Sequence, residues 1–199
     1  MSRILILTAV ELEARALARQ LELPALPSLP FPAFGRGTLR LAPDLRAGDL
    51  ILPESVIGPA AERLNVTPTA YARAAGLEPT ARHGTLVTSR DVVATATDKA
   101  ALHARTGAVA VDMESSLILT FAAGAGCPTL VVRGVSDAAG ENVPPELIGL
   151  VTDAGKLRTV RALALGVTRP HVLPRALALR HATQRALAAV ARLLTAFTE

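Results

Sequence analysis

Short apolar segments of strand length alternate with segments of helical periodicity along most of this chain. The strand-like segments lie within residues 3–10, 42–57, 82–95, 107–113 and 127–139. The helix-like segments lie within residues 11–21, 65–79, 98–106 and 114–126, and a long Arg/Ala/Leu helix is expected from about Pro174. Strands that alternate with helices predict an α/β fold, with a mainly parallel or mixed central sheet and helices on both faces.

The chain length and one proline-rich segment bear on domain organisation. The 199 residues suffice for one α/β domain, and since only 3% are aromatic, Ala, Leu and Val must fill its core. Residues 24–34 contain four prolines, a density that excludes a helix or a central strand. This segment lies too near the N-terminus to separate two domains, and no internal repeat occurs. We therefore predict a single domain over residues 1–199.

Composition argues against several classes of partner. The net charge is +4, but the arginines are scattered and few aromatic side chains are available for stacking, which argues against nucleic-acid binding. The apolar segment at 3–10 is too short to span a membrane. The single cysteine, Cys127, excludes an internal disulfide and favours a cytoplasmic location. The four histidines have no metal-ligand spacing, so no metal site is expected.

Polar side chains follow the predicted strands and form the candidate site. Ligands of open α/β sheets lie at the carboxyl ends of the strands, so these side chains are expected to lie close together. They are Glu11, Glu13, Asp91, Asp112, Glu114, Arg133, Ser136 and Asp137. Taken singly, the first two acids could be helix-start residues and Asp137 a turn residue. Arg133 inside an apolar segment is harder to dismiss, because a buried guanidinium needs an acidic or anionic partner.

The stretch VDMESS, residues 111–116, places two acids between a predicted strand and a predicted helix. A buried carboxylate is costly unless it is paired or hydrogen-bonded. Two interpretations remain open from the residues alone. Asp112 could cap the helix, or one of Asp112 and Glu114 could face a cleft and bind a ligand.

Residues 110–139, AVDMESSLILTFAAGAGCPTLVVRGVSDAA, resemble the signature half of the purine nucleoside phosphorylase/hydrolase superfamily. That family carries a Met-Glu pair at a helix start, followed by a strand that ends in Arg-x-x-Ser-Asp. It includes methylthioadenosine/S-adenosylhomocysteine nucleosidase, futalosine hydrolase and hopanoid-associated phosphorylase-like proteins. Other parts of the chain are also similar to the family, namely residues 3–17, 41–54, 84–93, 98–102 and 169–187.

The resemblance implies cleavage of the N-glycosidic bond of a 5′-substituted adenosine-type nucleoside, by water or by phosphate. It implies that Glu114 accepts hydrogen bonds from the ribose, that Asp137 protonates the leaving purine and that Glu13 positions a water. The supporting residues are Ser136 beside Asp137, Arg133 as a brace for Glu13 or an anion holder, Met113 on the sugar, and Asp91 and Val93 near the base. No cofactor is implied, inorganic phosphate is the second substrate of a phosphorylase, and a homo-oligomer is expected.

The sequence also departs from the family pattern. Where the family has a Gly-rich turn, this chain has Leu39 and Arg40, and the region between about residues 24 and 40 is shortened. Val92 and Val93 stand where the family often has an aromatic residue. Two alternatives to an ordinary enzyme therefore stay open. The chain could bind a nucleoside without turnover, or oligomer contacts could replace the missing elements.

Overall fold

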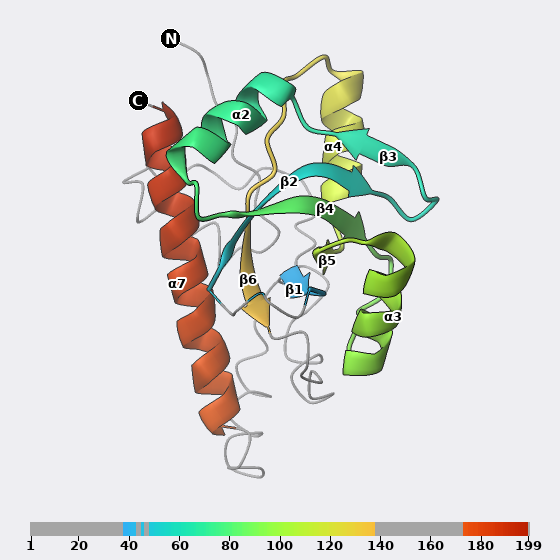
Figure 1. Ribbon diagram of the computed structural model, residues 1–199, viewed down its shortest axis with the longest axis vertical. Helices are drawn as coiled ribbons and strands as arrows, with labels where there is room; N and C mark the ends of the chain where they lie inside the picture. The colour runs from blue at the N-terminus through green and yellow to red at the C-terminus, as the bar shows by residue number, and fades with distance from the viewer. Residues whose placement is uncertain (1–37, 43–44, 46–47, 138–172, 199) are drawn as a thin grey trace, which may run out of the picture.

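The computed structural model describes residues 38–42, 45, 48–137 and 173–198 (Figure 1). Its strands are β1 (Thr38–Arg40), β2 (Leu50–Ile57), β3 (Arg63–Asn65), β4 (Arg82–Thr88), β5 (Ala110–Asp112) and β6 (Arg133–Asp137). Its helices are α2 (Pro68–Leu77), α3 (Ala96–Thr106), α4 (Ser115–Gly124) and α7 (Leu173–Thr198). The strand and helix predicted at 3–10 and 11–21, and the proline-rich segment, lie outside the described residues.

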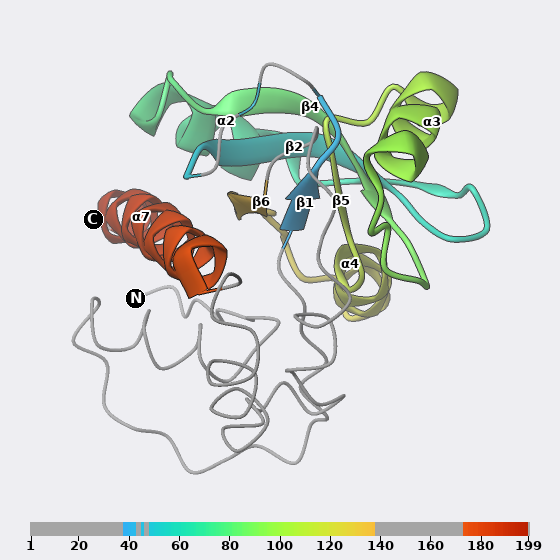
Figure 2. The same cartoon turned by 90° about the horizontal axis from the view of Figure 1, so that it is seen from below.

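The strands form one mixed sheet in the order β3-β2-β4-β5-β1-β6, and a further β2–β6 pairing closes five of them into a ring (Figure 2). β2, β4 and β5 run parallel to one another, whereas β1 is antiparallel to β5 and parallel to β6. Helix α7 packs along β6 and touches α2 and β2, while α4 contacts β2, β3 and β4. The predicted α/β fold with a mainly parallel or mixed sheet is confirmed.

Local sequence explains the bounds of α3 but not those of every strand. Helix α3 begins where the Thr95 hydroxyl accepts the Asp98 amide, and it ends at Gly107, whose φ of 66° is left-handed. Strand β6 begins only at Arg133, later than the predicted segment, which started at Cys127. Strands β1 and β3 were not predicted, because three residues are too few to display an alternating pattern.

Aliphatic side chains fill the core, as the composition predicts. The largest cluster includes Ile51, Val56, Leu86 and Val135, all of them fully buried. A second cluster joins β2 to α7 through Leu52 and Leu193, among others. No helix within the described ranges is long and apolar enough to cross a membrane.

Two histidines make polar contacts within the described part of the chain. The Tyr71 hydroxyl donates to Glu54 Oε1 at 2.9 Å and lies 2.9 Å from His83 Nδ1. Burial and the Glu54 carboxylate raise the pKa of Tyr71 to about 12, so its hydroxyl stays protonated. His103 Nδ1 lies 2.9 Å from the Ala108 carbonyl, beyond the end of α3. No group of three or more potential metal ligands occurs among the residues that the structure describes.

Close packing of α7 on β6 leaves no room for a side chain at Gly134. A Cβ there would lie 2.5 Å from the Ala186 Cβ and 3.2 Å from its backbone. We expect Gly134→Ala to lower the free energy of unfolding by about 1–3 kcal/mol, because α7 would have to move off the sheet. Urea unfolding followed by circular dichroism measures this loss.

Gly76→Ala is the matched control, since a Cβ at this helical position in α2 meets nothing within 4 Å. That variant is expected to gain up to about 1 kcal/mol from helix propensity. Equal stability of Gly134→Ala and the parent would show that α7 does not pack as closely as described.

Candidate functional site

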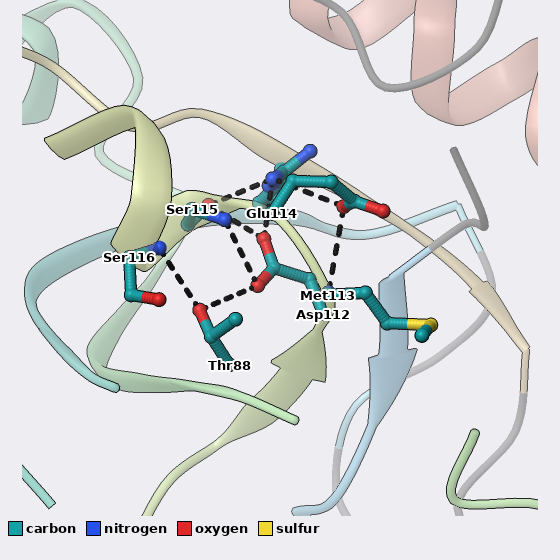
Figure 3. Close-up of polar contacts among 7 residues, drawn as sticks. Thr88, Asp112, Met113, Glu114, Ser115 and Ser116 are labelled. Atoms are coloured by element: carbon teal, nitrogen blue, oxygen red, sulfur yellow. Dashed lines mark hydrogen bonds and ion pairs between the residues drawn. The ribbon is translucent and has the colours of Figure 1, made fainter. Parts of the chain in front are cut away.

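A buried hydrogen-bond network surrounds Asp112 at the junction of β5 and α4 (Figure 3). Its carboxylate accepts the hydroxyls of Thr88 at 2.9 Å and Ser115 at 2.5 Å, and the Ser115 amide at 3.3 Å. The Thr88 hydroxyl in turn accepts the Ser116 amide at 3.0 Å. Asp112 and Thr88 thus satisfy the first two amide groups of α4, which have no partner inside the helix. This confirms the capping interpretation of Asp112.

Arg133 joins the network from β6. Its Nη2 donates to Asp112 Oδ2 and to Ser115 Oγ, the latter at 2.7 Å, and lies 3.8 Å from Glu114 Oε2. Its side chain is only 14% exposed, and Nε has no hydrogen-bond partner among the described residues. The sequence predicted an acidic partner for this guanidinium. That partner is Asp112, and Glu114 lies farther away. Glu13, its suggested partner, lies outside the described residues.

The strand directions explain why Arg133 reaches this place. β6 runs opposite to β5, because β1 between them is antiparallel to one and parallel to the other. The side chain that meets the end of β5 therefore comes from the first residue of β6 and not from its last. Asp112 lies at the carboxyl end of its strand, as expected, and meets Thr88 at the end of β4, whereas Arg133 lies at the start of its strand.

Glu114 occupies the residue before the first turn of α4. Its side chain is 10% exposed, and Oε2 accepts the Met113 amide at 3.4 Å. The Met113 side chain points away from the Asp112 carboxylate (Figure 3). Asp112 is 2% exposed and accepts four hydrogen bonds within the described residues, whereas Glu114 as a whole residue is 8% exposed and is the more accessible of the two acids.

The other predicted site residues lie after β4 and at the end of β6. Asp91 is exposed in the loop after β4, where its amide meets the Ser89 hydroxyl at 3.3 Å, and Val93 packs against a core cluster that includes Val87 and Val111. Ser136 and Asp137 end β6, and their side chains lie outside what the structure describes. Leu39 of β1 pairs with Asp137 on one side and with Val111 on the other. Two strand spacings therefore separate Asp137 from Val111, about 10 Å between backbones.

Sequence reasoning missed the contributions of Thr88 and Ser115. Thr88 is the last residue of β4, and its hydroxyl joins β5 to α4. The sequence did contain one indication of its role, because Thr88 directly precedes the polar residues that follow this strand. Ser115 bridges Asp112 and Arg133 through its hydroxyl. Hydroxyl side chains are common at helix starts, so Ser115 does not stand out in the sequence alone.

Within the described residues, the site brings the Arg133 guanidinium together with the carboxylates of Asp112 and Glu114. Ionised carboxylates accept hydrogen bonds from hydroxyl groups and stabilise positive charge nearby. This chemistry suits a ligand that presents hydroxyl groups.

Comparison with known proteins places the site within a family. The family model described as the phosphorylase superfamily matches residues 39–167, more than half of the chain. The match contains β5, α4 and β6, and with them the Asp112 network. No protein with a curated description matches the sequence.

Solved structures share the fold at low identity. A Francisella philomiragia protein described as a putative 5′-methylthioadenosine/S-adenosylhomocysteine nucleosidase has a TM-score of 0.68 at 13% identity, covering 96% of each chain. A Helicobacter pylori 5′-methylthioadenosine/S-adenosylhomocysteine nucleosidase has a TM-score of 0.58 at 15% identity, over 81% of this chain and 65% of its own. The H. pylori futalosine hydrolase scores 0.57 at 15% identity, over 81% and 64%. This chain thus spans less than two thirds of either H. pylori enzyme.

Proposed function

The chain belongs to the phosphorylase superfamily, and on this premise we propose that it cleaves the N-glycosidic bond of a purine nucleoside of the 5′-substituted adenosine type. The observation that carries the proposal is the position of Glu114. This acid lies at the end of β5, at the start of α4, with the Arg133 guanidinium 3.8 Å away. The H. pylori nucleosidase, a structural relative, has been solved as a mutant with 5′-methylthioadenosine in its active site.

In the proposed reaction, the bond between the ribose C1′ and the purine nitrogen breaks. Positive charge develops on the sugar and the bond's electron pair departs with the base. Glu114 accepts hydrogen bonds from the ribose hydroxyls and stabilises the positive sugar. Met113 packs on the sugar.

The departing base needs a proton, and Asp137 supplies it to a ring nitrogen as a general acid, with Ser136 holding its carboxyl group. A water oxygen then bonds to C1′, and Glu13 receives the proton that the water loses. In a phosphorylase, an oxygen of inorganic phosphate forms this bond instead. No cofactor takes part in either scheme. Asp91 and Val93 are proposed to lie near the base.

A second candidate is a module that binds a nucleoside without cleaving it. Leu39, which stands where the family has a Gly-rich turn, belongs to strand β1 between β5 and β6. A leucine in place of a glycine at this position supports altered access for the sugar or for phosphate. A homo-oligomer and a cytoplasmic location remain predictions from the sequence.

One assay separates these candidates. Purified protein is incubated with adenosine or 5′-methylthioadenosine, with and without inorganic phosphate, and the free base is measured by chromatography. Release of adenine in both buffers indicates hydrolysis, and release only with phosphate indicates phosphorolysis. Binding of the nucleosides without release of base would support the binding module. The absence of both binding and release would contradict the proposed function.

A further inference from the structure

We propose that the exposed face of helix α4 is a docking surface for a second copy of this chain, with α4 of one copy against α4 of the other across a two-fold axis. This α4 face comprises the exposed residues of the helix and of the segment that follows it, namely Leu117, Thr120, Phe121 and residues 123–128. The inference does not depend on the proposed nucleoside chemistry.

Two large apolar side chains are exposed to solvent on the α4 face. Leu117 is 71% exposed and Phe121 is 75% exposed, more than any other large apolar side chain among the described residues. They lie four residues apart and are therefore neighbours on the helix surface. Another side of α4 buries Leu119 in the largest core cluster, on the face of the sheet away from α3 (Figure 2). Helix α4 is thus apolar towards the core and towards solvent, whereas an exposed helix normally has charged residues on its outer face.

The α4 face carries no charge. Residues 115–132 contain no Asp, Glu, Lys, Arg or His, although 19% of the whole chain is charged. A surface that binds a charged partner carries complementary charges, and a helix that lies on a membrane carries Lys and Arg on its polar face. A neutral apolar face is complementary to itself, because a two-fold axis then brings no like charges together. Since each copy has a net charge of +4, an uncharged face is where two copies meet with little repulsion.

The neighbouring strand β3 extends this surface. Helix α4 has ten residues and is about 15 Å long, too short by itself for a stable interface, which buries about 800 Å² on each partner. Strand β3 contacts α4 and ends the order of the described sheet. Exposed Glu62, Arg63 and Asn65 are polar, and the two charged residues have opposite signs. The result is an apolar centre with a polar rim, as in homodimer interfaces.

The test measures the oligomeric state of the full chain by sedimentation velocity, without any nucleoside. The parent should sediment as a dimer. Phe121→Lys should sediment as a monomer, with a dissociation constant raised by about 100-fold or more, because two lysines would then be buried near each other at the axis. Leu117→Lys should have the same effect. Leu177→Lys is its matched control, since it makes the same change at an exposed leucine of α7, and it should remain dimeric.

A mixture of two variants tests whether the α4 face meets the same face of a second copy. Phe121→Lys and Phe121→Glu should each be monomeric. An equimolar mixture of the two should form dimers again at low ionic strength, because opposite charges then meet across the axis. Circular dichroism verifies that the monomers are folded, and if the variants at position 121 do not fold, Leu117→Lys and Leu117→Glu replace them.

Three results would overturn the proposal. The first is a monomeric parent, including one that sediments with phosphatidylcholine vesicles, which would assign the face to a lipid surface instead. The second is a dimer that survives both Phe121→Lys and Leu117→Lys, because another surface would then hold it together. The third is a mixture of folded Lys and Glu variants that stays monomeric. None of these measurements involves nucleoside binding or cleavage, so the proposed function is tested separately.

Discussion

Asp137→Asn is expected to lower the rate of nucleoside cleavage by about 10²–10⁴-fold while changing nucleoside affinity little. The proton that Asp137 is proposed to donate matters most as the glycosidic bond breaks, so its loss falls on the transition state. An asparagine retains a hydrogen bond to the base but cannot deliver a proton at neutral pH. Steady-state kinetics with 5′-methylthioadenosine separates kcat from KM.

The control for this variant is Asp98→Asn, the same change at an exposed residue in the first turn of α3. It should leave kcat unchanged. If Asp137 only ends β6 and turns the chain, Asp137→Asn should instead lower the melting temperature and leave kcat intact. That combination would remove Asp137 from the proposed catalytic residues.

Glu114→Gln is expected to weaken nucleoside binding by about 10–100-fold with the fold preserved, because each lost charge-assisted hydrogen bond is worth about 1.5–3 kcal/mol. The substitution keeps the shape and replaces one acceptor oxygen with a donor. Calorimetry with formycin A, a C-nucleoside without a cleavable N-glycosidic bond, measures the affinity, and circular dichroism verifies the fold.

Glu62→Gln is the matched control, since Glu62 is exposed in the turn between β2 and β3, where it accepts the Ala60 amide. Its affinity for formycin A should equal that of the parent. Parent-like affinity in Glu114→Gln as well would mean that Glu114 only marks the start of α4.

The sequence by itself was enough for the α/β class and for most of the described elements. Segments such as β2, α3 and α7 carry enough apolar residues to show their period, and a threonine cap and a glycine mark the two ends of α3. The sequence also predicted an acidic partner for Arg133, because a buried guanidinium needs a partner of opposite charge. These conclusions depend on local chemistry, which the order of residues displays directly.

Tertiary structure alone decided which groups meet. The direction of β6 depends on β1, a strand of three residues without a recognisable pattern, and this direction brings Arg133 to the end of β5. The choice of Asp112 as the main partner of Arg133, and the link that Thr88 makes to α4, follow from the same arrangement. Strand pairing joins residues that are far apart in the chain. The alternation of apolar and polar side chains shows where a strand forms, but not which strand it pairs with or in which direction it runs.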